Sequence, residues 1–497
     1  MNHSAALSSS SNRIAIIPLI LIGAVIALTL GFVIPGQSLG PLLYGIVAGS
    51  YALVLNNPVW VLAPVMVTHF ALSGYIPGTD ITVRLAVSVV SAALALPAIV
   101  RMFQLRDSRL AYVMVPAIGF FGLVTAANLL HSDAEYAYKY FRYQFTQLVV
   151  LLLAASLIRE RRDLKYVSCV VLLIALASAL SAIWQHFDRH GAPYSILGSE
   201  RVGRIDGRSP GLNSSAIQLA NDMPSVLLPI LGLLAVGPLR FDRTRIALLA
   251  ATVMIGLGAY FTYTRSVMYA VAAGIITIGL YLRGPRRILI FAVVVCAAIV
   301  FLLSEGTGLI GARYYRGVED DRSAATHLAL WQVGLAMALD NAIVGVGHQD
   351  FDDVAVEYES VVDVGSVDEP MVASMEGRHP HNDFLNVWFS WGIFTLAAYL
   401  ALFAGTFVNL AIAARSPDIL VRGLAVGCAG GLATYAVNSA FHNYLDSSPY
   451  LFLYAGLSIA LTRLTAVPSV TRRVQRVSML RLGSYSADRP VLPRSRP

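Results

Sequence analysis

The sequence predicts an all-α, polytopic membrane protein with about fourteen transmembrane helices, in a range of about twelve to fourteen. Only 13% of its residues are charged and 57% are hydrophobic, with a mean hydropathy of +0.66. A soluble protein of this size carries about 25% charged residues. Apolar runs of roughly 20 residues match the thickness of a bilayer, and inside lipid their backbone polar groups can be paired only within a helix.

These runs divide the chain into five parts. The first begins at Ile14 and is too long for a signal-peptide core, so we expect a retained helix. The parts are a tail at 1–13, eleven spans within 14–304, an outward loop at 305–382, three spans within 383–465 and a basic tail at 466–497. The expected spans are 14–34, 39–55, 58–76, 82–100, 110–130, 144–158, 166–184, 217–236, 246–263, 267–282, 286–304, 383–411, 421–440 and 450–465.

Basic side chains predict the orientation. If the N-terminus is cytoplasmic, all basic clusters of the short loops fall on the cytoplasmic side, at 101–109, 159–165, 240–245, 283–287 and 415–422. Short cytoplasmic loops are enriched in Lys and Arg. We therefore expect a multi-pass membrane protein with both termini in the cytoplasm. The basic tail fits anionic membrane lipids better than nucleic acid.

The outward loop 305–382 is long enough for a small extramembrane subdomain. Its segment 305–378 holds 14 acidic residues against 4 arginines, but their spacing matches no metal-binding loop, so we expect no metal. Residues 323–340 predict a helix at the membrane interface, with Ser323 as its cap and Trp331 at head-group depth. A tight turn with close backbone approach is predicted after it, at Gly345 and Gly347.

Polar residues gather where this loop re-enters the membrane. His379, His381, Asn382 and Asp383 lie there, and Gly392 follows Asn382 after nine intervening residues. A histidine at a helix mouth can take a proton from a hydroxyl group near neutral pH. The alternative is a polar cluster that only caps the helix.

Outward arginines are the second group of candidates. Arg265 lies in a short turn between two apolar runs and departs from the positive-inside trend, so it is a candidate phosphate ligand, or else a snorkelling side chain. Arg201, Arg204 and Arg208 precede a helix that opens near Asn213, and helix N-termini favour anions. Two further signals are weaker. Basic and aromatic residues that suit a sugar phosphate, but also a membrane surface, are Arg313, Arg316 and Arg322 with Tyr314 and Tyr315. His442 with Asn443 is the second signal, and such a histidine is most often an ordinary interfacial one.

Several function classes are disfavoured. The chain has no nucleotide-binding motif of the Walker or dinucleotide type. Few ionisable residues fall within the predicted spans, where ion-coupled transporters keep them. Cys169, Cys296 and Cys428 lie in apolar runs and form no disulfide pattern. The polar groups instead point to chemistry at the outer membrane face.

Residues from about 203 to 400 resemble the core of the O-antigen ligase and polymerase family of bacterial inner-membrane enzymes. Four blocks match in order: Arg208 to Gly211 with Asn213, Thr264 to Ser266, Trp331 to Gly347 with Phe351, and His381-Asn382 with Gly392. The sequence departs from the family pattern at His327, where an Arg often precedes the loop Trp, at Asn341-Ala342 and at Thr395.

The resemblance implies transfer of a glycan from an undecaprenyl diphosphate carrier, at the periplasmic face, to a lipid A core or to another carrier-linked repeat. It implies no metal, nucleotide or other cofactor. His381 would activate the acceptor hydroxyl, Arg265 and Arg208 would hold the diphosphate, and Arg204, Arg322 and Asn382 would help to bind substrate. Ligases and polymerases of O-antigen or exopolysaccharide share these residues.

Two hypotheses from other classes stay open. A transporter or flippase for a lipid-linked glycan predicts a polar path with charged or broken spans near the midplane. A non-catalytic subunit, working among polysaccharide assembly proteins, predicts that His381 and Arg265 tolerate substitution.

Overall fold

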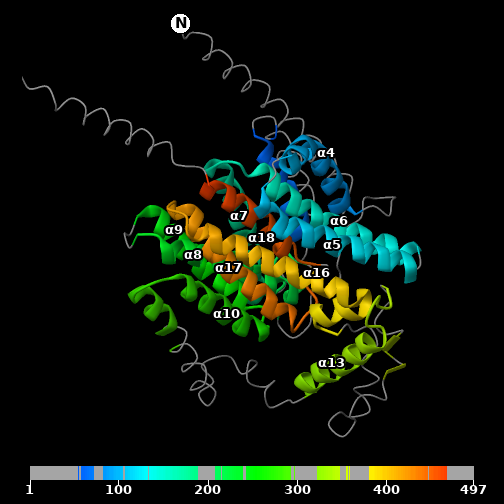
Figure 1. Cartoon of the computed structure of the whole chain (residues 1–497). Helices are drawn as coiled ribbons and strands as arrows, with labels where there is room; N and C mark the ends of the chain where they lie inside the picture. The colour runs from blue at the N-terminus through cyan, green and yellow to red at the C-terminus, as the bar shows by residue number, and fades with distance from the viewer. Residues whose placement is uncertain are drawn as a thin grey trace, which may run out of the picture.

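The computed structural model describes residues 57–71, 82–104, 107–131, 134–188, 208–213, 215–238, 242–292, 322–347, 380–445 and 447–466, with a few isolated positions besides. This described part forms a helical bundle with thirteen helices (Figure 1). They are η1 (Pro58–Val61), α3 (Leu62–Ala71), α4 (Val83–Gln104), α5 (Ser108–His131), α6 (Ala134–Leu157), α7 (Arg161–Phe187), α8 (Ala216–Val236), α9 (Arg243–Tyr260), α10 (Ser266–Tyr281), α13 (Arg322–Asp340), α16 (Asp383–Ala413), α17 (Ile419–Ser439) and α18 (Tyr450–Ala466).

Six of the described helices are long and apolar enough to cross a membrane: α4, α5, α7, α8, α16 and α17. Shorter apolar helices cover Pro58–His69, Ser266–Tyr281 and Tyr450–Thr465. The chain is therefore a polytopic, all-helical membrane protein, as predicted. The predicted spans 14–34 and 39–55, and most of 286–304, lie outside the described residues.

Two expected boundaries were wrong. Residues 131–143 were assigned to an outward loop, but α6 already begins at Ala134. Its first turns carry Glu135 and Lys139, so hydropathy alone placed the start of the run too late. Ser323 was expected to cap the loop helix, but α13 begins one residue earlier, at Arg322.

The bundle has two ends, and one of them is basic. We call it the arginine end. Four interactions join helix ends there: Arg463 with the carbonyl oxygen of Ala155, Arg161 with Asp418 at 2.9 Å, Asn409 with the carbonyl oxygen of Arg109 at 3.1 Å, and Arg286 with the carbonyl oxygens of Ala235 and Val236 at 3.0 and 3.2 Å. The described members of the predicted basic clusters therefore share one end.

Small residues bring the central helices into close contact. Gly423, Gly427 and Gly431 recur every fourth residue along α17. A Cβ on Gly232 of α8 would overlap the backbone of Gly427, and one on Gly274 of α10 would overlap the Thr434 side chain. Helices in lipid gain little from hydrophobic burial, so close backbone approach supplies van der Waals packing and stabilises this α8–α17–α10 core.

α16 is broken at Gly392, where φ is 81° and ψ is 172°. The predicted turn with Gly345 and Gly347 packs directly against this break, with Val346 N bonded to Phe389 O and Gly347 N to Ser390 O, both at 2.9 Å. The close backbone approach inferred from the two glycines is thus confirmed. It fixes α13, which lies at the edge of the bundle beside α16 (Figure 1).

Candidate functional site

The candidate site lies at the end of the bundle opposite the arginine end, which we call the histidine end. His381 occupies the turn just before α16 and has a left-handed backbone, with φ 48°. Its neighbour Asn382 caps the helix, because its Oδ1 accepts hydrogen bonds from Phe384 N and Leu385 N at 3.0 and 3.2 Å. A left-handed non-glycine residue costs of order 1 kcal/mol and is common at functional sites.

Three histidines from three separate elements surround one point. The ring centres of His381 and His327, on α13, are 5.2 Å apart. His442, in the loop after α17, lies 5.9 Å from His381 and 6.1 Å from His327. The departure from the family pattern at His327 therefore coincides with a side chain that faces His381.

His442 is held in its neutral form. Burial lowers its pKa to about 3, and electrostatic interactions with His381, His327 and Arg208 act in the same direction. Its Nδ1 is buried and has no hydrogen-bond partner in the part of the chain that the structure describes. A neutral imidazole beside His381 can exchange a proton or a hydrogen bond with a bound hydroxyl.

Asp383 positions the loop that carries His442. It is fully buried at the first position of α16. Its carboxylate accepts hydrogen bonds from Tyr444 N, at 3.0 and 3.1 Å, and from Leu445 N, at 3.2 Å. The backbone that precedes α16 and the backbone that follows His442 are thereby joined.

The Arg208 block and the Arg265 turn also lie side by side. Ser209 N donates a 3.1 Å hydrogen bond to Phe261 O, in the turn before α10. Gly211, at φ 63°, exchanges two 2.8 Å hydrogen bonds with the side chain of Gln185 at the end of α7. A Cβ at Gly211 would meet Ser178 O, so this turn requires glycine.

Arg265 is half-buried at the start of α10. Tyr263, two residues earlier, has φ 50°, the other left-handed non-glycine backbone among the described residues. Within those residues no hydrogen bond or ion pair engages the Arg265 guanidinium, so its donors can take a ligand. Arg208 acts on His442 electrostatically, which places one predicted arginine beside the histidine cluster.

Other predicted residues are less informative. Arg201, Arg204, Arg313, Arg316 and His379 lie outside the described residues. Arg322 forms the start of α13, and its side chain is not among the described ones.

Sequence reasoning missed three charged residues in helices near this end. Asp222, in the second turn of α8, is buried and accepts hydrogen bonds from Asn213 at 2.6 Å and from Ser448 at 3.0 Å, and so ties the Arg208 block to the His442 loop. Arg142 of α6 is also buried, and Arg84, in the first turn of α4, is half-buried and donates to His69 O at 3.3 Å. For Asp222 and Arg84, the available signal was a charge inside an apolar run, which marks function by default.

Among the described residues, no group of three His, Cys, Asp or Glu side chains has a geometry that could hold a metal ion. The three imidazoles thus form a cluster of close rings whose nitrogens do not converge on one point.

Comparison with known proteins assigns a family to the segment that carries most of this site. Residues 250–400 match the family model described as O-antigen ligase. The match includes Arg265, His327, His381 and Gly392. A comparison with curated proteins found none that matches this chain. Members of the family are glycosyl-transferring enzymes, ligases or polymerases, that act on lipid-linked glycans in polysaccharide assembly. The chain is thus a multi-pass membrane protein in which residues 250–400 match the O-antigen ligase family model.

Proposed function

We propose that this protein transfers a glycan from an undecaprenyl diphosphate carrier to a sugar hydroxyl, at the periplasmic face of a bacterial inner membrane. The observation that carries the proposal is the cluster of His381, His327 and His442 at one end of the bundle, with Arg208 acting on it. A base next to a cation is what attack of a hydroxyl on a sugar diphosphate requires.

The orientation follows from the arginine end. Lys and Arg are enriched in short cytoplasmic loops, so the arginine end faces the cytoplasm and the histidine end the periplasm. Both chain termini then lie on the cytoplasmic side, and the outward loop 305–382, with α13, is periplasmic. The two predicted spans before the described bundle, together with the span 286–304, would complete a set of about fourteen.

In the proposed reaction, the acceptor oxygen forms a bond to the anomeric carbon of the donor sugar. The bond between that carbon and the diphosphate oxygen breaks, and undecaprenyl diphosphate leaves with the bonding electrons. His381 receives the hydroxyl proton. Arg265 and Arg208 donate to the departing diphosphate, because the planar guanidinium fork can donate to two phosphate oxygens at once. Arg204 and Arg322 would also bind the substrate, and Asn382 would hold the turn that presents His381.

The transporter alternative has less support. It requires charged residues along a path through the bilayer, near its midplane. The charged residues Arg84, Arg142 and Asp222 all belong to early turns of their helices at the histidine end. Asp222 is the seventh residue of α8, which is about 10 Å from the helix start at 1.5 Å per residue. This depth suits a substrate site at one face.

The test uses a deletion strain that is complemented with the wild-type chain, with His381→Ala or with Arg265→Ala. His131→Ala and Lys139→Ala serve as controls, since both residues lie at the histidine end outside the cluster. Surface polysaccharide and carrier-linked glycan are compared on gels, and membrane levels of each variant are measured. General-base catalysis contributes about 10²–10⁴-fold, so His381→Ala should behave like the deletion while the controls restore polymer.

The deletion itself separates the two subtypes. Long chains that accumulate on the carrier, with none on lipopolysaccharide, indicate a ligase, whereas single repeats in place of long chains indicate a polymerase. Normal polymer in both His381→Ala and Arg265→Ala would overturn the catalytic assignment and favour a non-catalytic subunit.

A further inference from the structure

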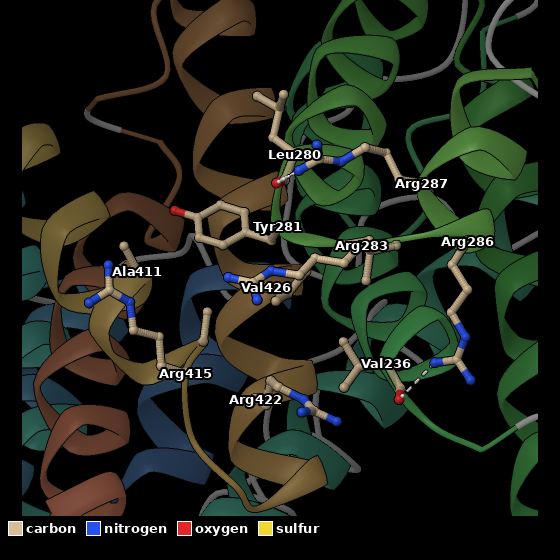
Figure 2. Close-up of a pocket in the computed structure, with 12 residues that line it drawn as sticks. Val236, Leu280, Tyr281, Arg283, Arg286, Arg287, Ala411, Arg415, Arg422 and Val426 are labelled. Carbon is tan, nitrogen blue, oxygen red and sulfur yellow. Dashed lines mark hydrogen bonds between the residues drawn. The ribbon is translucent and has the colours of Figure 1, made fainter.

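A cavity of about 620 Å³ opens at the arginine end, in the size range of small-molecule pockets (Figure 2). Its wall is formed by the last residues of α8, α10 and α16, the turn after α10 and the first half of α17. The opposite terminus of each of these four helices lies at the histidine end. α10 alone has 16 residues, or about 24 Å, so the cavity is separate from the candidate glycan site.

Five arginines and no acidic side chain line this cavity. They are Arg283, Arg286, Arg287, Arg415 and Arg422. Two of these arginines, Arg286 and Arg287, have a structural role that explains their presence. Arg286 donates to the last carbonyl groups of α8, at 3.0 and 3.2 Å, and Arg287 donates to Gly279 O and Leu280 O of α10, at 3.2 and 2.7 Å. Such contacts cap helix C-termini.

Arg283, Arg415 and Arg422 have no such role. In the described part of the chain, no hydrogen bond or ion pair engages any of these three guanidiniums. Figure 2 shows them around the same space, while Arg286 and Arg287 turn to carbonyl oxygens. Like charges that lie close together repel one another, so an anion bound among these three arginines would stabilise the arrangement.

The acidic residue of the adjoining loop does not supply that anion. Asp418 forms an ion pair of 2.9 Å with Arg161, and its Oδ1 caps α17 by accepting from Leu420 N and Val421 N. Its carboxylate is therefore already engaged. The charge that balances the three arginines must come from outside the described chain.

The surroundings indicate that the anion belongs to a lipid. The rest of the lining is largely apolar, including Val236, Leu282 and Val426. Beside it, Leu280, Ile288 and Leu289 are 59%, 70% and 64% exposed, as side chains that face acyl chains would be. A basic pocket between transmembrane helices, open to lipid, favours a phosphate head group, which guanidinium groups bind in a fork.

We propose that this cavity binds the phosphate of an anionic lipid head group, at the membrane face opposite the histidine cluster. Arg283, Arg415 and Arg422 supply the donors, and the apolar wall accommodates the adjoining acyl chain. This site goes beyond the proposed glycan transfer and does not depend on it. Its occupant would join the ends of α10, α16 and α17.

The test measures binding of dioleoyl phosphatidylglycerol to the full chain in neutral detergent by native mass spectrometry, with dioleoyl phosphatidylcholine as the zwitterionic comparison. The triple variant Arg283→Gln, Arg415→Gln and Arg422→Gln should weaken phosphatidylglycerol binding by about tenfold or more. The control triple is Arg101→Gln, Lys165→Gln and Arg243→Gln. It removes the same charge from exposed positions at the same end and should change affinity by less than about twofold.

Equal losses in the two triple variants would mean that only surface charge attracts the lipid, and would overturn the proposal. Displacement of the lipid by inorganic phosphate at equal concentration would also overturn it, in favour of a soluble anion. If the triple variant does not fold, Arg422→Gln replaces it, with an expected loss of about threefold and an unchanged affinity as the contrary result.

Discussion

The backbone amide of Ile393 donates a 2.8 Å hydrogen bond to the carbonyl oxygen of Ala342. Ile393 follows the break in α16, and Ala342 follows α13. The end of α13 is thus fixed to the break in α16 by main-chain bonds. These bonds help to hold His327, on α13, close to His381, in the turn before α16. The site geometry therefore depends on a break in a transmembrane helix.

Gly392 is the residue most sensitive to a small change. A Cβ there would overlap Ile343 O, and a φ of 81° with a ψ of 172° is a conformation almost restricted to glycine. Gly392→Ala should destabilise the protein by about 3 kcal/mol or more and abolish glycan transfer. Gly122→Ala is the matched control, since a Cβ there meets nothing within 4 Å. Similar melting temperatures for the two variants would contradict the packing argument.

Asp383 should act as a positioning residue. Asp383→Ala leaves Tyr444 N and Leu445 N buried without their acceptor, which costs about 1–3 kcal/mol for each unsatisfied group. Asp383→Asn keeps one acceptor oxygen and should recover part of both stability and transfer. Melting temperature and transfer rate are measured together. If Asp383→Asn and Asp383→Ala lower the melting temperature and the transfer rate equally, the loop is not held by this carboxylate.

Acid should destabilise the protein through His442. Its pKa is lowered from 6.5 to about 3 by burial and by nearby positive charge. Between pH 6.5 and pH 3 the imidazole of His442 is protonated in the unfolded state but neutral in the folded state. The contribution of neutral His442 to folding stability is therefore present above pH 6.5 and is lost as pH falls towards 3. At pH 5.5 the loss is about 1.4 kcal/mol.

The check compares thermal unfolding at pH 7.5 and pH 5.5 for the wild type and for His442→Phe, which keeps an aromatic ring. The variant should lose less stability on acidification than the wild type. His131→Phe, at an exposed position, should behave as the wild type does. A variant as acid-sensitive as the wild type would exclude His442 as the source.

At Arg265, charge and shape can be separated. A lysine keeps the charge but lacks the planar fork that binds two phosphate oxygens. Arg265→Lys should retain more transfer than Arg265→Ala but fall about tenfold or more below the wild type. Release of undecaprenyl diphosphate is the readout, with Lys139→Ala as control. Full activity in the lysine variant would reduce the role of Arg265 to that of a point charge.

Chelation should not stop the reaction. The departing diphosphate is stabilised by Arg265 and Arg208 in the proposed mechanism, which needs no metal ion. Treatment of membranes with EDTA should leave the transfer rate within about twofold. Loss of transfer that added Mg²⁺ restores would show that a cation on the donor diphosphate shares this role.

The sequence alone determined the membrane class, the positions of the apolar helices and the grouping of basic loops. These properties follow from local hydropathy and charge, which act the same way whatever the helices pack against. The pattern of His381, Asn382 and Gly392 also identified the start of α16 correctly. Loop boundaries such as the start of α6 were wrong because charged first turns resemble a loop in composition.

Only the tertiary structure decided which distant residues meet. His327 looked like a departure from a pattern and His442 like an interfacial histidine, until packing of α13, α16 and the loop after α17 placed both beside His381. In the same way, the sequence explained three arginines only by the enrichment of basic residues in cytoplasmic loops, whereas in the fold they surround one cavity. They are Arg283, Arg415 and Arg422. Contacts between helices depend on close approach at glycines and on buried polar bonds, and hydropathy does not encode these.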